Sequence, residues 1–278
     1  MILITGATGT IGSEVLRQLA DRGERVRPMA RDLSKLSVEG VRGDFADPGS
    51  LERALQGVDS VLLVTAFGTD LARHDLALVE AARRAGTRKV VKISAMGTGE
   101  STEENDVRSW HHPGEQAVRG SGMAWTLLRP AGFASNALMW AQAVGAGRPI
   151  PNMTGDGGQG VVDPRDVAAV AVEALTGEHD GRTYTLTGPE VISVPGQAEV
   201  LGEVLGRDVA TVPVPLEAAR EGMLTSGMDP LMVEVFMTGS AFVAGGGAAV
   251  LSGDVEAVLG RAPRSFADWA RDHKDAFA

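Results

Sequence analysis

Three glycines near the start of the chain, Gly6, Gly9 and Gly12, follow one another at a constant spacing of three residues. The run before them, 1–5, is apolar and β-branched like a strand buried on both faces, and the apolar residues of 11–19 recur with helical period. A turn without Cβ atoms between a strand and a helix lets the backbone approach a pyrophosphate, and free N–H groups at the helix start bind its oxygens. The pattern predicts a dinucleotide site; the alternative is a glycine-rich turn without a ligand.

Two basic residues follow the next strand pattern, at 25–30. In dinucleotide-binding folds the end of this strand lies beside the adenosine ribose, where an Asp or Glu holds the 2′-hydroxyl of NAD and an Arg accommodates the 2′-phosphate of NADP. Arg31 ends the strand, and Lys35 comes shortly after it. A guanidinium matches phosphate oxygens with paired hydrogen bonds, and an ammonium adds a point charge. We predict that both residues bind a phosphate; the alternatives are Asp32 as an NAD-selecting acid, or solvated surface charge.

Asp44 and Phe45 are expected beside the adenine ring, one as a hydrogen-bond acceptor and the other as an apolar edge. They follow a short apolar segment, 38–41, that we interpret as a third strand. Asp47 and Pro48 then mark the start of a helix, because Asp is a good N-cap and proline suits the first helical turn.

Strand and helix patterns alternate through the first 187 residues, which predicts an α/β fold with a doubly wound, parallel Rossmann-type sheet. We expect the strands at 1–5, 25–30, 38–41, 59–65, 89–94, 124–129 and 182–186, and the helices after the first glycine turn and at 50–56, 70–85, 110–119, 137–144 and 163–175. Loops rich in small and polar residues are expected at 95–107 and 155–160.

The alternation stops after residue 187, and a smaller, mainly helical C-terminal lobe is expected at 188–278. Its helices are expected at 197–205, 215–224, 229–242, 254–259 and 265–277, with a short strand at 209–214. Ligands of parallel sheets bind outside the carboxyl ends of the strands, so this lobe is expected to cover that crevice and the substrate. We divide the chain into a dinucleotide-binding domain, 1–187, of which 131–160 contributes to the substrate cleft, and a substrate-covering lobe, 188–278.

The composition excludes several classes of function. A formal net charge of −10 argues against nucleic acid as a partner. The chain has no cysteine, which removes disulfides and thiolate chemistry, and its histidines show no spacing for a metal site. No apolar run is long enough to span a bilayer and no basic leader comes first, so we expect a cytoplasmic protein without a membrane partner. The expected partner is a small-molecule substrate, and a homodimer is one option for the assembly.

Several segments together resemble the NmrA-like, NAD(P)H-binding group of atypical short-chain dehydrogenase/reductases. The matching pieces are TGATGTIG at 5–12, GDFAD at 43–47, VKIS at 91–94, SGMAWTLLRP at 121–130 with Phe133 and Asn136, DPRDVA at 163–168 and YTLTGP at 184–189. They occur in family order across roughly the first 190 residues, whereas the rest of the chain matches in general character. The resemblance implies NADPH/NADP⁺ as the cofactor. The residues expected to contact it are Gly6, Thr8, Gly9, Thr10, Ile11, Gly12, Arg31, Lys35, Asp44, Phe45, Thr65, Ala66, Pro130 and Phe133.

The chain departs from the wider superfamily at the catalytic positions. There a Tyr delivers a proton and a Lys four residues on lowers its pKa, but counting back from 121–122 places Val107 at the Tyr position and His111 at the Lys position. Ser94 stands at the strand end where the superfamily has its Ser. We predict His111 and Ser94 as the catalytic residues. His111 is expected either to bind a nicotinamide ribose hydroxyl or to act as a general acid near neutral pH, and a solvated surface histidine is the alternative.

Asn136, Trp140 and Met153 are predicted to line the substrate pocket, although core packing is the alternative for the apolar ones. Methionines and a phenylalanine between 223 and 237 form a second candidate, either a soft cover over the substrate or ordinary core. The resulting hypothesis is an NADPH-dependent reductase that transfers hydride to a small unsaturated acceptor of the quinone, imine or enone type. The alternative is a non-catalytic NADP(H) sensor that binds a partner protein.

Overall fold

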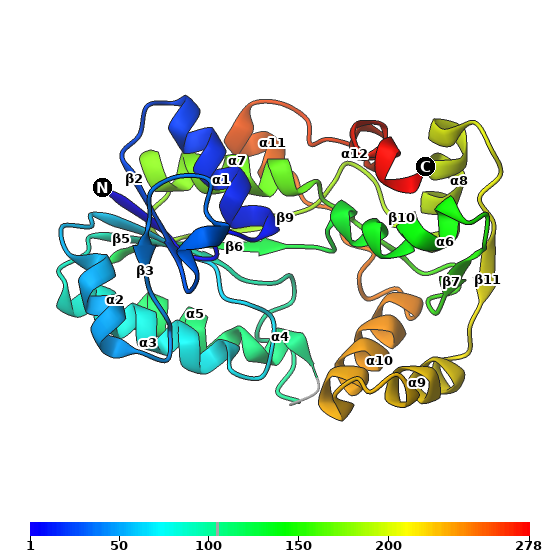
Figure 1. Cartoon of the computed structure of the whole chain (residues 1–278), viewed down its shortest axis with the longest axis horizontal. Helices are drawn as coiled ribbons and strands as arrows, with labels where there is room; N and C mark the ends of the chain where they lie inside the picture. Colours follow the sequence, from blue (N-terminus) through cyan, green and yellow to red (C-terminus); the bar gives the residue numbers. More distant parts are fainter. Residues whose placement is uncertain (104–105) are drawn as a thin grey trace.

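A seven-stranded parallel sheet forms the centre of the first part of the molecule, in the order β3-β2-β1-β4-β5-β6-β9 (Figure 1). The computed structural model describes residues 1–103 and 106–278. The strands of this sheet are β1 (Ile2–Ile4), β2 (Val26–Ala30), β3 (Val41–Arg42), β4 (Ser60–Leu63), β5 (Lys89–Ile93), β6 (Ala124–Pro130) and β9 (Arg182–Leu186). The chain winds outward in both directions from β1, which confirms the predicted doubly wound α/β fold.

Helices cover both faces of the sheet, as Figure 1 shows. One face carries α1 (Thr10–Asp21), α7 (Pro164–Thr176) and α11 (Asp254–Leu259), and the other carries α2 (Pro48–Leu55), α3 (Leu71–Arg84) and α5 (His112–Gly120). Side chains of a strand alternate between the faces, so Ile2 and Ile4 join the core under α1 and α7, and Leu3 joins the core over α2 and α3. Burial on both sides explains why all three residues of β1 are apolar.

The helix starts follow the capping residues that the sequence indicates. The Asp47 side chain accepts a hydrogen bond from the Ser50 N–H at 3.2 Å at the start of α2, and Asp163 accepts one from the Arg165 N–H at 2.8 Å at the start of α7. Proline occupies the first helical position in both. Each cap satisfies a backbone donor that the helix leaves unpaired.

Two predicted elements of the first domain differ in extent. The third strand contains only Val41 and Arg42, and the expected residues before them, 38–40, form a bend and irregular backbone after η1 (Leu33–Lys35), a turn of 3₁₀-helix. The helix expected at 110–119 consists of α4 (Val107–Trp110) and α5, separated at His111. Pro113 has no N–H to continue the earlier hydrogen bonds, so the second helix starts anew there. Part of the loop expected at 95–107, residues 104–105, lies outside the described residues.

The second lobe combines 131–161 with the end of the chain. Its elements are η2 (Ala134–Trp140), α6 (Ala141–Gly145), β7 (Ile150–Asn152), β8 (Gly158–Gln159), β10 (Ile192–Ser193), α8 (Val194–Leu205), β11 (Thr211–Pro213), α9 (Leu216–Thr225), α10 (Pro230–Ala244), α12 (Phe266–Asp272) and η3 (Lys274–Phe277). Strand β7 pairs with β11 and β8 pairs with β10. The segment expected as a loop at 155–160 therefore contains a strand, and the mainly helical character of the lobe is confirmed.

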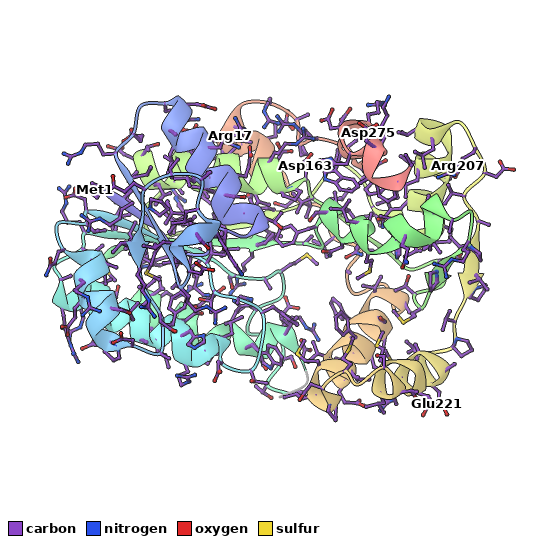
Figure 2. The ribbon with its side chains drawn as sticks, in the orientation of Figure 1. Met1, Arg17, Asp163, Arg207, Glu221 and Asp275 are labelled. Carbon is purple, nitrogen blue, oxygen red and sulfur yellow. The ribbon has the colours of Figure 1, made fainter. Side chains whose placement is uncertain are left out.

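The lobe has its own core, in which Trp269, Phe266 and Phe277 are almost fully buried. The guanidinium of Arg207, labelled in Figure 2, donates to the Phe277 carbonyl at 2.7 Å and holds the end of the chain against α8. Helix α11 leaves this lobe and places Val255 in the core beside α7. The division of the chain at residue 187 stays a prediction, since α11 packs with the first domain.

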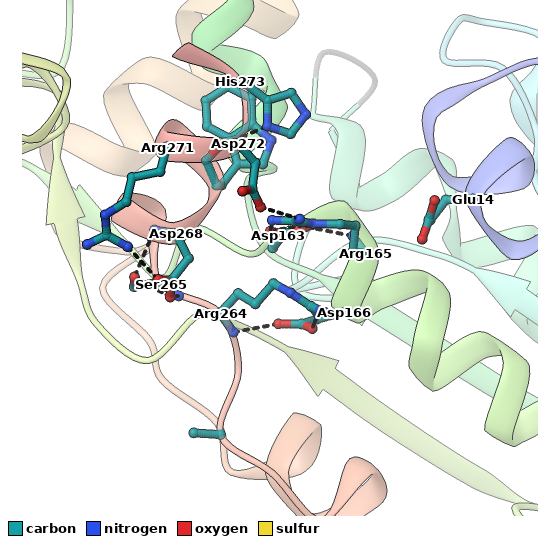
Figure 3. A network of polar contacts seen from close by, with 12 residues as sticks. Glu14, Asp163, Arg165, Asp166, Arg264, Ser265, Asp268, Arg271, Asp272 and His273 are labelled. Carbon is teal, nitrogen blue, oxygen red and sulfur yellow. Dashed lines mark hydrogen bonds and ion pairs between the residues drawn. The ribbon is translucent and has the colours of Figure 1, made fainter. Parts of the chain in front are cut away.

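Buried carboxylates connect the start of α7 to the last part of the chain (Figure 3). Asp163 pairs with Arg165 at 2.6 Å, and Arg165 reaches Asp272 on α12 at 2.5 Å. The neighbouring Asp166 binds Arg261 at 2.7 Å and also Arg264. These contacts fix the second lobe to the sheet domain.

No helix among the described residues has the length and apolar character that crossing a membrane requires.

Candidate active site

The carboxyl ends of β1 and β4 meet at the point where the strand order reverses. The Thr5 hydroxyl oxygen accepts a hydrogen bond from the Val64 N–H at 2.8 Å and so links the two strand ends. Gly6 follows with φ +60°, and a Cβ there would lie 3.0 Å from the Val64 side chain. Only glycine suits this turn. In doubly wound folds a nucleotide binds in the crevice at this reversal.

The glycine turn leads directly into α1. A Cβ on Gly12 would lie 2.2 Å from the Gly6 carbonyl oxygen, so the tight packing of helix against turn requires glycine. Gly9 is the N-cap, and no side chain caps the first N–H groups of α1. A Cβ on Gly9 would meet only the Gly6 carbonyl, at 3.3 Å. Free N–H donors beside an open glycine fit a pyrophosphate. The Ile11 side chain is buried in the core, so this residue offers its backbone to a phosphate.

A cavity of about 240 Å³ extends from this turn to the ends of β2 and β3. Its described lining is Gly6, Thr8, Met29, Ala30, Arg31, Asp32, Lys35, Gly43, Asp44, Phe45, Val64, Ala66 and His74. The structure thus brings seven residues of the predicted cofactor set around one cavity: Gly6, Thr8, Arg31, Lys35, Asp44, Phe45 and Ala66. Sequence reasoning did not include His74, which stacks on Phe45 at 5.3 Å between ring centroids, because the two are far apart in the chain.

The charged residues at the end of β2 have different roles. Asp32 accepts hydrogen bonds from the N–H of Ser34 at 3.0 Å and its hydroxyl at 2.7 Å, which lower the pKa of Asp32 and cap η1. Arg31 and Lys35 are exposed, and neither forms an ion pair with another described residue. A free guanidinium and a free ammonium at this position favour a phosphate over a ribose hydroxyl.

A buried ion pair lies beside the next strand ends. Lys92 on β5 and Asp75 on α3 are both fully buried, with Nζ and Oδ2 2.6 Å apart. The Thr65 hydroxyl, which follows β4, donates to the other oxygen of Asp75 at 2.5 Å. Thr65 is a predicted cofactor residue, so this ion pair lies directly behind the expected site. Neither Asp75 nor Lys92 was singled out from the sequence, because a lysine inside an apolar strand gives no signal of its partner.

His111 completes this group from the junction of α4 and α5. Its Nδ1 lies 3.3 Å from Lys92 Nζ, and only 9% of the residue is exposed. The alternative of a solvated surface histidine is therefore wrong. Burial, and then the charge of Lys92, hold the pKa of His111 well below its usual range. The expectation of an acid that titrates near neutral pH does not fit this environment.

Ser94 lies in a second polar cluster, at the end of β5. Its hydroxyl donates to Glu115 on α5 at 2.6 Å, and Glu115 accepts two hydrogen bonds from Arg129 at 2.9 and 2.7 Å. Burial acts to raise the pKa of Glu115, but the hydrogen bonds from Arg129 and Ser94 bring it below the usual value. The Ser94 proton is thus directed at a charged carboxylate. A catalytic role for Ser94 stays a prediction.

A second cavity, of about 230 Å³, lies between the ends of β5 and β6 and helix α10. Its described lining is Ala95, Met96, Asp106, Val107, Arg108, Pro130, Ala131, Gly132, Gln159, Thr238, Gly239, Phe242, Val243 and Ala248. Most of these residues are apolar. The Arg108 guanidinium lies 4.1 Å from the centre of the Phe242 ring and pairs with Asp106 at 2.5 Å. We call this space the acceptor cavity.

The residues predicted for the substrate pocket do not line the acceptor cavity. Asn136 is exposed, Trp140 packs against the core of the second lobe, and Met153 is half-buried outside the lining. Pro130, which was predicted to contact the cofactor, does line the acceptor cavity. Phe133, from the same predicted set, packs against the core of the first domain. Helix α10 contributes Phe242 to the lining. This residue follows the methionine-rich segment 223–237, which the sequence suggested as a cover over the substrate.

The fold and the glycine turn define a dinucleotide-binding α/β protein, and comparisons identify its family. Residues 6–178 match the family model described as NAD(P)H-binding. The (4-alkanoyl-5-oxo-2,5-dihydrofuran-3-yl)methyl phosphate reductase of Streptomyces griseus is 41% identical, over 100% of this chain and 99% of the relative. NAD(P)H azoreductase of Xenophilus azovorans is 36% identical, over 100% of this chain and 99% of the relative. The NADPH-dependent quinone oxidoreductase of Escherichia coli, solved with NADPH, has a TM-score of 0.87 at 22% identity, over 98% of this chain and 99% of that chain.

The chain therefore belongs to the NAD(P)H-binding family, in agreement with its NmrA-like resemblance. It is an NAD(P)H-dependent oxidoreductase, and NADPH/NADP⁺ is its cofactor.

Proposed function

We propose that this protein transfers hydride from NADPH to a small, electron-poor conjugated carbonyl compound of the enone type. The observation that carries the proposal is the acceptor cavity, which is mainly apolar and has no free acid among its described residues. Burial acts to raise the pKa of Asp106, but hydrogen bonds from Arg108 outweigh it and hold the pKa below its usual range. A carboxylate that stays ionised does not supply a proton. A conjugated acceptor needs orientation and a dry pocket more than an acid.

Gln159 is the residue that we assign to the acceptor's carbonyl oxygen. Its side chain lines the acceptor cavity and makes no hydrogen bond to another residue of the described ranges, 1–103 and 106–278. A Cβ on Gly132 would lie 2.2 Å from its Oε1, so the glycine makes room for this amide. Strand β8, paired with β10, holds Gln159 on a regular element. An amide N–H here would bind the oxygen on which negative charge develops.

The butenolide reductase from Streptomyces griseus, 41% identical along the whole chain, supports an acceptor with a conjugated ring carbonyl. The azoreductase supports the broader class of electron-poor acceptors. Bound NADPH would supply the hydride. Gly6, Thr8, Gly9, Thr10 and Gly12 would hold its pyrophosphate, Arg31 and Lys35 its 2′-phosphate, Asp44 and Phe45 its adenine, and Thr65, Ala66, Pro130 and Phe133 its nicotinamide end.

The test is NADPH oxidation by the purified protein with three acceptors: an acylated butenolide phosphate, a quinone and an azo dye. We expect the butenolide to be consumed in a one-to-one ratio with NADPH and with the highest kcat/KM. Product analysis should show a saturated carbon–carbon bond, with the hydride of NADPH added at the β-carbon and a proton from water taken up at the α-carbon. Normal NADPH binding without turnover on any of the three would reject all three acceptor classes for this protein. A preference for the quinone or the dye would reject the enone assignment alone.

A further inference from the structure

The fully buried Asp75–Lys92 pair has no role in the nucleotide cavity or the acceptor cavity, since neither residue lines them. Removing two charges from water costs several kcal/mol each, to order of magnitude, and apolar replacements of such pairs are often neutral or stabilising. Stabilisation of the fold is therefore a weak explanation for the presence of this buried ion pair. Its contacts point to another role, because both residues connect parts of the expected active site.

The Lys92 ammonium has three N–H donors and no acceptor. Three acceptors surround it: Asp75 Oδ2 at 2.6 Å, the Ile93 carbonyl at 3.3 Å and His111 Nδ1 at 3.3 Å. Because the ammonium only donates, Nδ1 must present a lone pair. The single proton of a neutral imidazole is then on Nε2.

The charged groups on the surrounding elements also favour a neutral His111 ring. Lys92 comes from β5, with Asp75 from α3 behind it. On α5, Glu115 is occupied by Arg129 and Ser94, and the adjacent His112 is exposed. Arg108, on α4, pairs with Asp106. No carboxylate of a described residue accepts a hydrogen bond from the His111 ring, so nothing there stabilises an imidazolium.

The helix packing holds this arrangement in place. A Cβ on Gly114 would lie 2.2 Å from Asp75 Oδ2, so α5 approaches α3 this closely because residue 114 is glycine. Asp75 also accepts from Thr65, at the end of β4. The chain of contacts therefore runs from Thr65 through Asp75 and Lys92 to His111, and it fixes the ring from behind.

We propose that Lys92, held by Asp75, is a positioning residue that keeps His111 neutral with its proton on Nε2. His111 then donates one hydrogen bond to a hydroxyl or carbonyl oxygen at the nicotinamide end of the site and does not deliver a proton. The hydrogen bond from His111 to the nicotinamide end rests on the proposed function, whereas the tautomer of His111 does not. This assignment extends the position-based argument that His111 replaces the superfamily's Lys.

The direct test is the nitrogen chemical shifts of ¹⁵N-histidine-labelled protein with NADP⁺, assigned by loss of one signal in His111→Asn. We expect an unprotonated Nδ1 and a protonated Nε2 from about pH 5 to 8. A ring that titrates near its ordinary value, or that carries its proton on Nδ1, would overturn the proposal. This readout needs no turnover, so its failure is distinct from failure of the reductase assignment.

The second test replaces both charges at once, in Asp75→Leu/Lys92→Met, to avoid an unpaired buried charge. We expect His111 to show mixed tautomers or to titrate, and kcat to fall about 10-fold, as loss of one oriented hydrogen bond implies. Asp163→Asn is the matched control, because it alters a buried ion pair on α7 and keeps the helix cap. It should leave the His111 signals and kcat unchanged. Unaltered His111 signals in the double variant would reject the role of Lys92.

Discussion

The two halves of the active site are made in different ways. The nucleotide half comes from consecutive strand ends and turns within the first 75 residues, and much of its chemistry is backbone: the Gly6–Gly12 turn and the uncapped start of α1. The acceptor half collects side chains from distant segments, among them Arg108, Gln159 and Phe242. A backbone site requires particular glycines at fixed spacing, whereas a side-chain cavity requires only that the fold bring suitable residues together.

This difference implies that the halves can be damaged separately. Substitutions in the nucleotide half should affect NADPH binding and, through it, every acceptor. Substitutions in the acceptor half should affect one acceptor and leave the affinity for NADPH unchanged. The experiments below test this separation.

The largest effect is expected for Gly9→Val. The branched side chain would occupy the space of the pyrophosphate, so NADPH binding should fall by at least about 100-fold, the size expected when several charge-assisted hydrogen bonds are lost. Calorimetric titration with NADPH measures it, and circular dichroism should show a folded protein.

Gly9→Ala is the graded companion of this variant. Its Cβ would meet only the Gly6 carbonyl, at 3.3 Å, so the fold should accept it with a smaller loss of affinity. Gly12→Ala should instead destabilise the protein, because its Cβ would lie 2.2 Å from the same oxygen. Normal NADPH affinity in Gly9→Val would place the nucleotide elsewhere.

The next effect is on cofactor choice. Arg31→Ala should remove most of the preference for NADPH over NADH, about 10- to 100-fold, because one charge-assisted phosphate contact is worth about 1.5–3 kcal/mol. Dissociation constants for both dinucleotides measure it. Arg25→Ala is the matched control, since Arg25 is also exposed but lies just before the start of β2, away from the cavity. Equal affinity of the wild type for both dinucleotides would contradict the assignment of Arg31.

In the acceptor half, Gln159→Leu should lower kcat/KM for a conjugated carbonyl about 10-fold, the cost of one hydrogen bond to developing charge. The dissociation constant for NADPH should not change, because Gln159 does not line the nucleotide cavity. Gln142→Leu, on the exposed side of α6, should change neither quantity. If Gln159→Leu weakened NADPH binding to the same extent, the two halves would not be separable.

The same difference explains what the sequence could predict. The sheet, the caps at Asp47 and Asp163 and the glycine turn have local signals, because strand period, capping and missing Cβ atoms act between near neighbours. The cavity around Arg31 and Phe45 followed from the order of the strands. The contacts of the individual residues with the cofactor stay predictions.

The acceptor half has no such local signal. Trp140 was a reasonable pocket candidate, yet an amphipathic pattern does not say which of two cores an aromatic ring joins, and it packs in the second lobe. The contact between Lys92 and Asp75 depends on how α3 crosses β5, which neither segment encodes alone. Gln159 lay in a segment expected as a loop, so its place in a strand facing the cavity was not visible.

The smallest effect concerns His111, which lies between the halves. Burial and the Lys92 charge lower its pKa in the folded protein, whereas the unfolded chain keeps an ordinary value near about 6.5. The unfolded state therefore binds more protons below that pH, and the contribution to stability is present above it and lost as the pH falls. Between pH 7 and pH 6 the free energy of unfolding should decrease by about 0.7 kcal/mol through this group. His111→Asn should remove this dependence, whereas the exposed neighbour variant His112→Asn should keep it. Urea denaturation at the two pH values measures the difference. If the free energy of unfolding had the same pH dependence in the wild type and in His111→Asn, His111 would not be shielded in the way the structure describes.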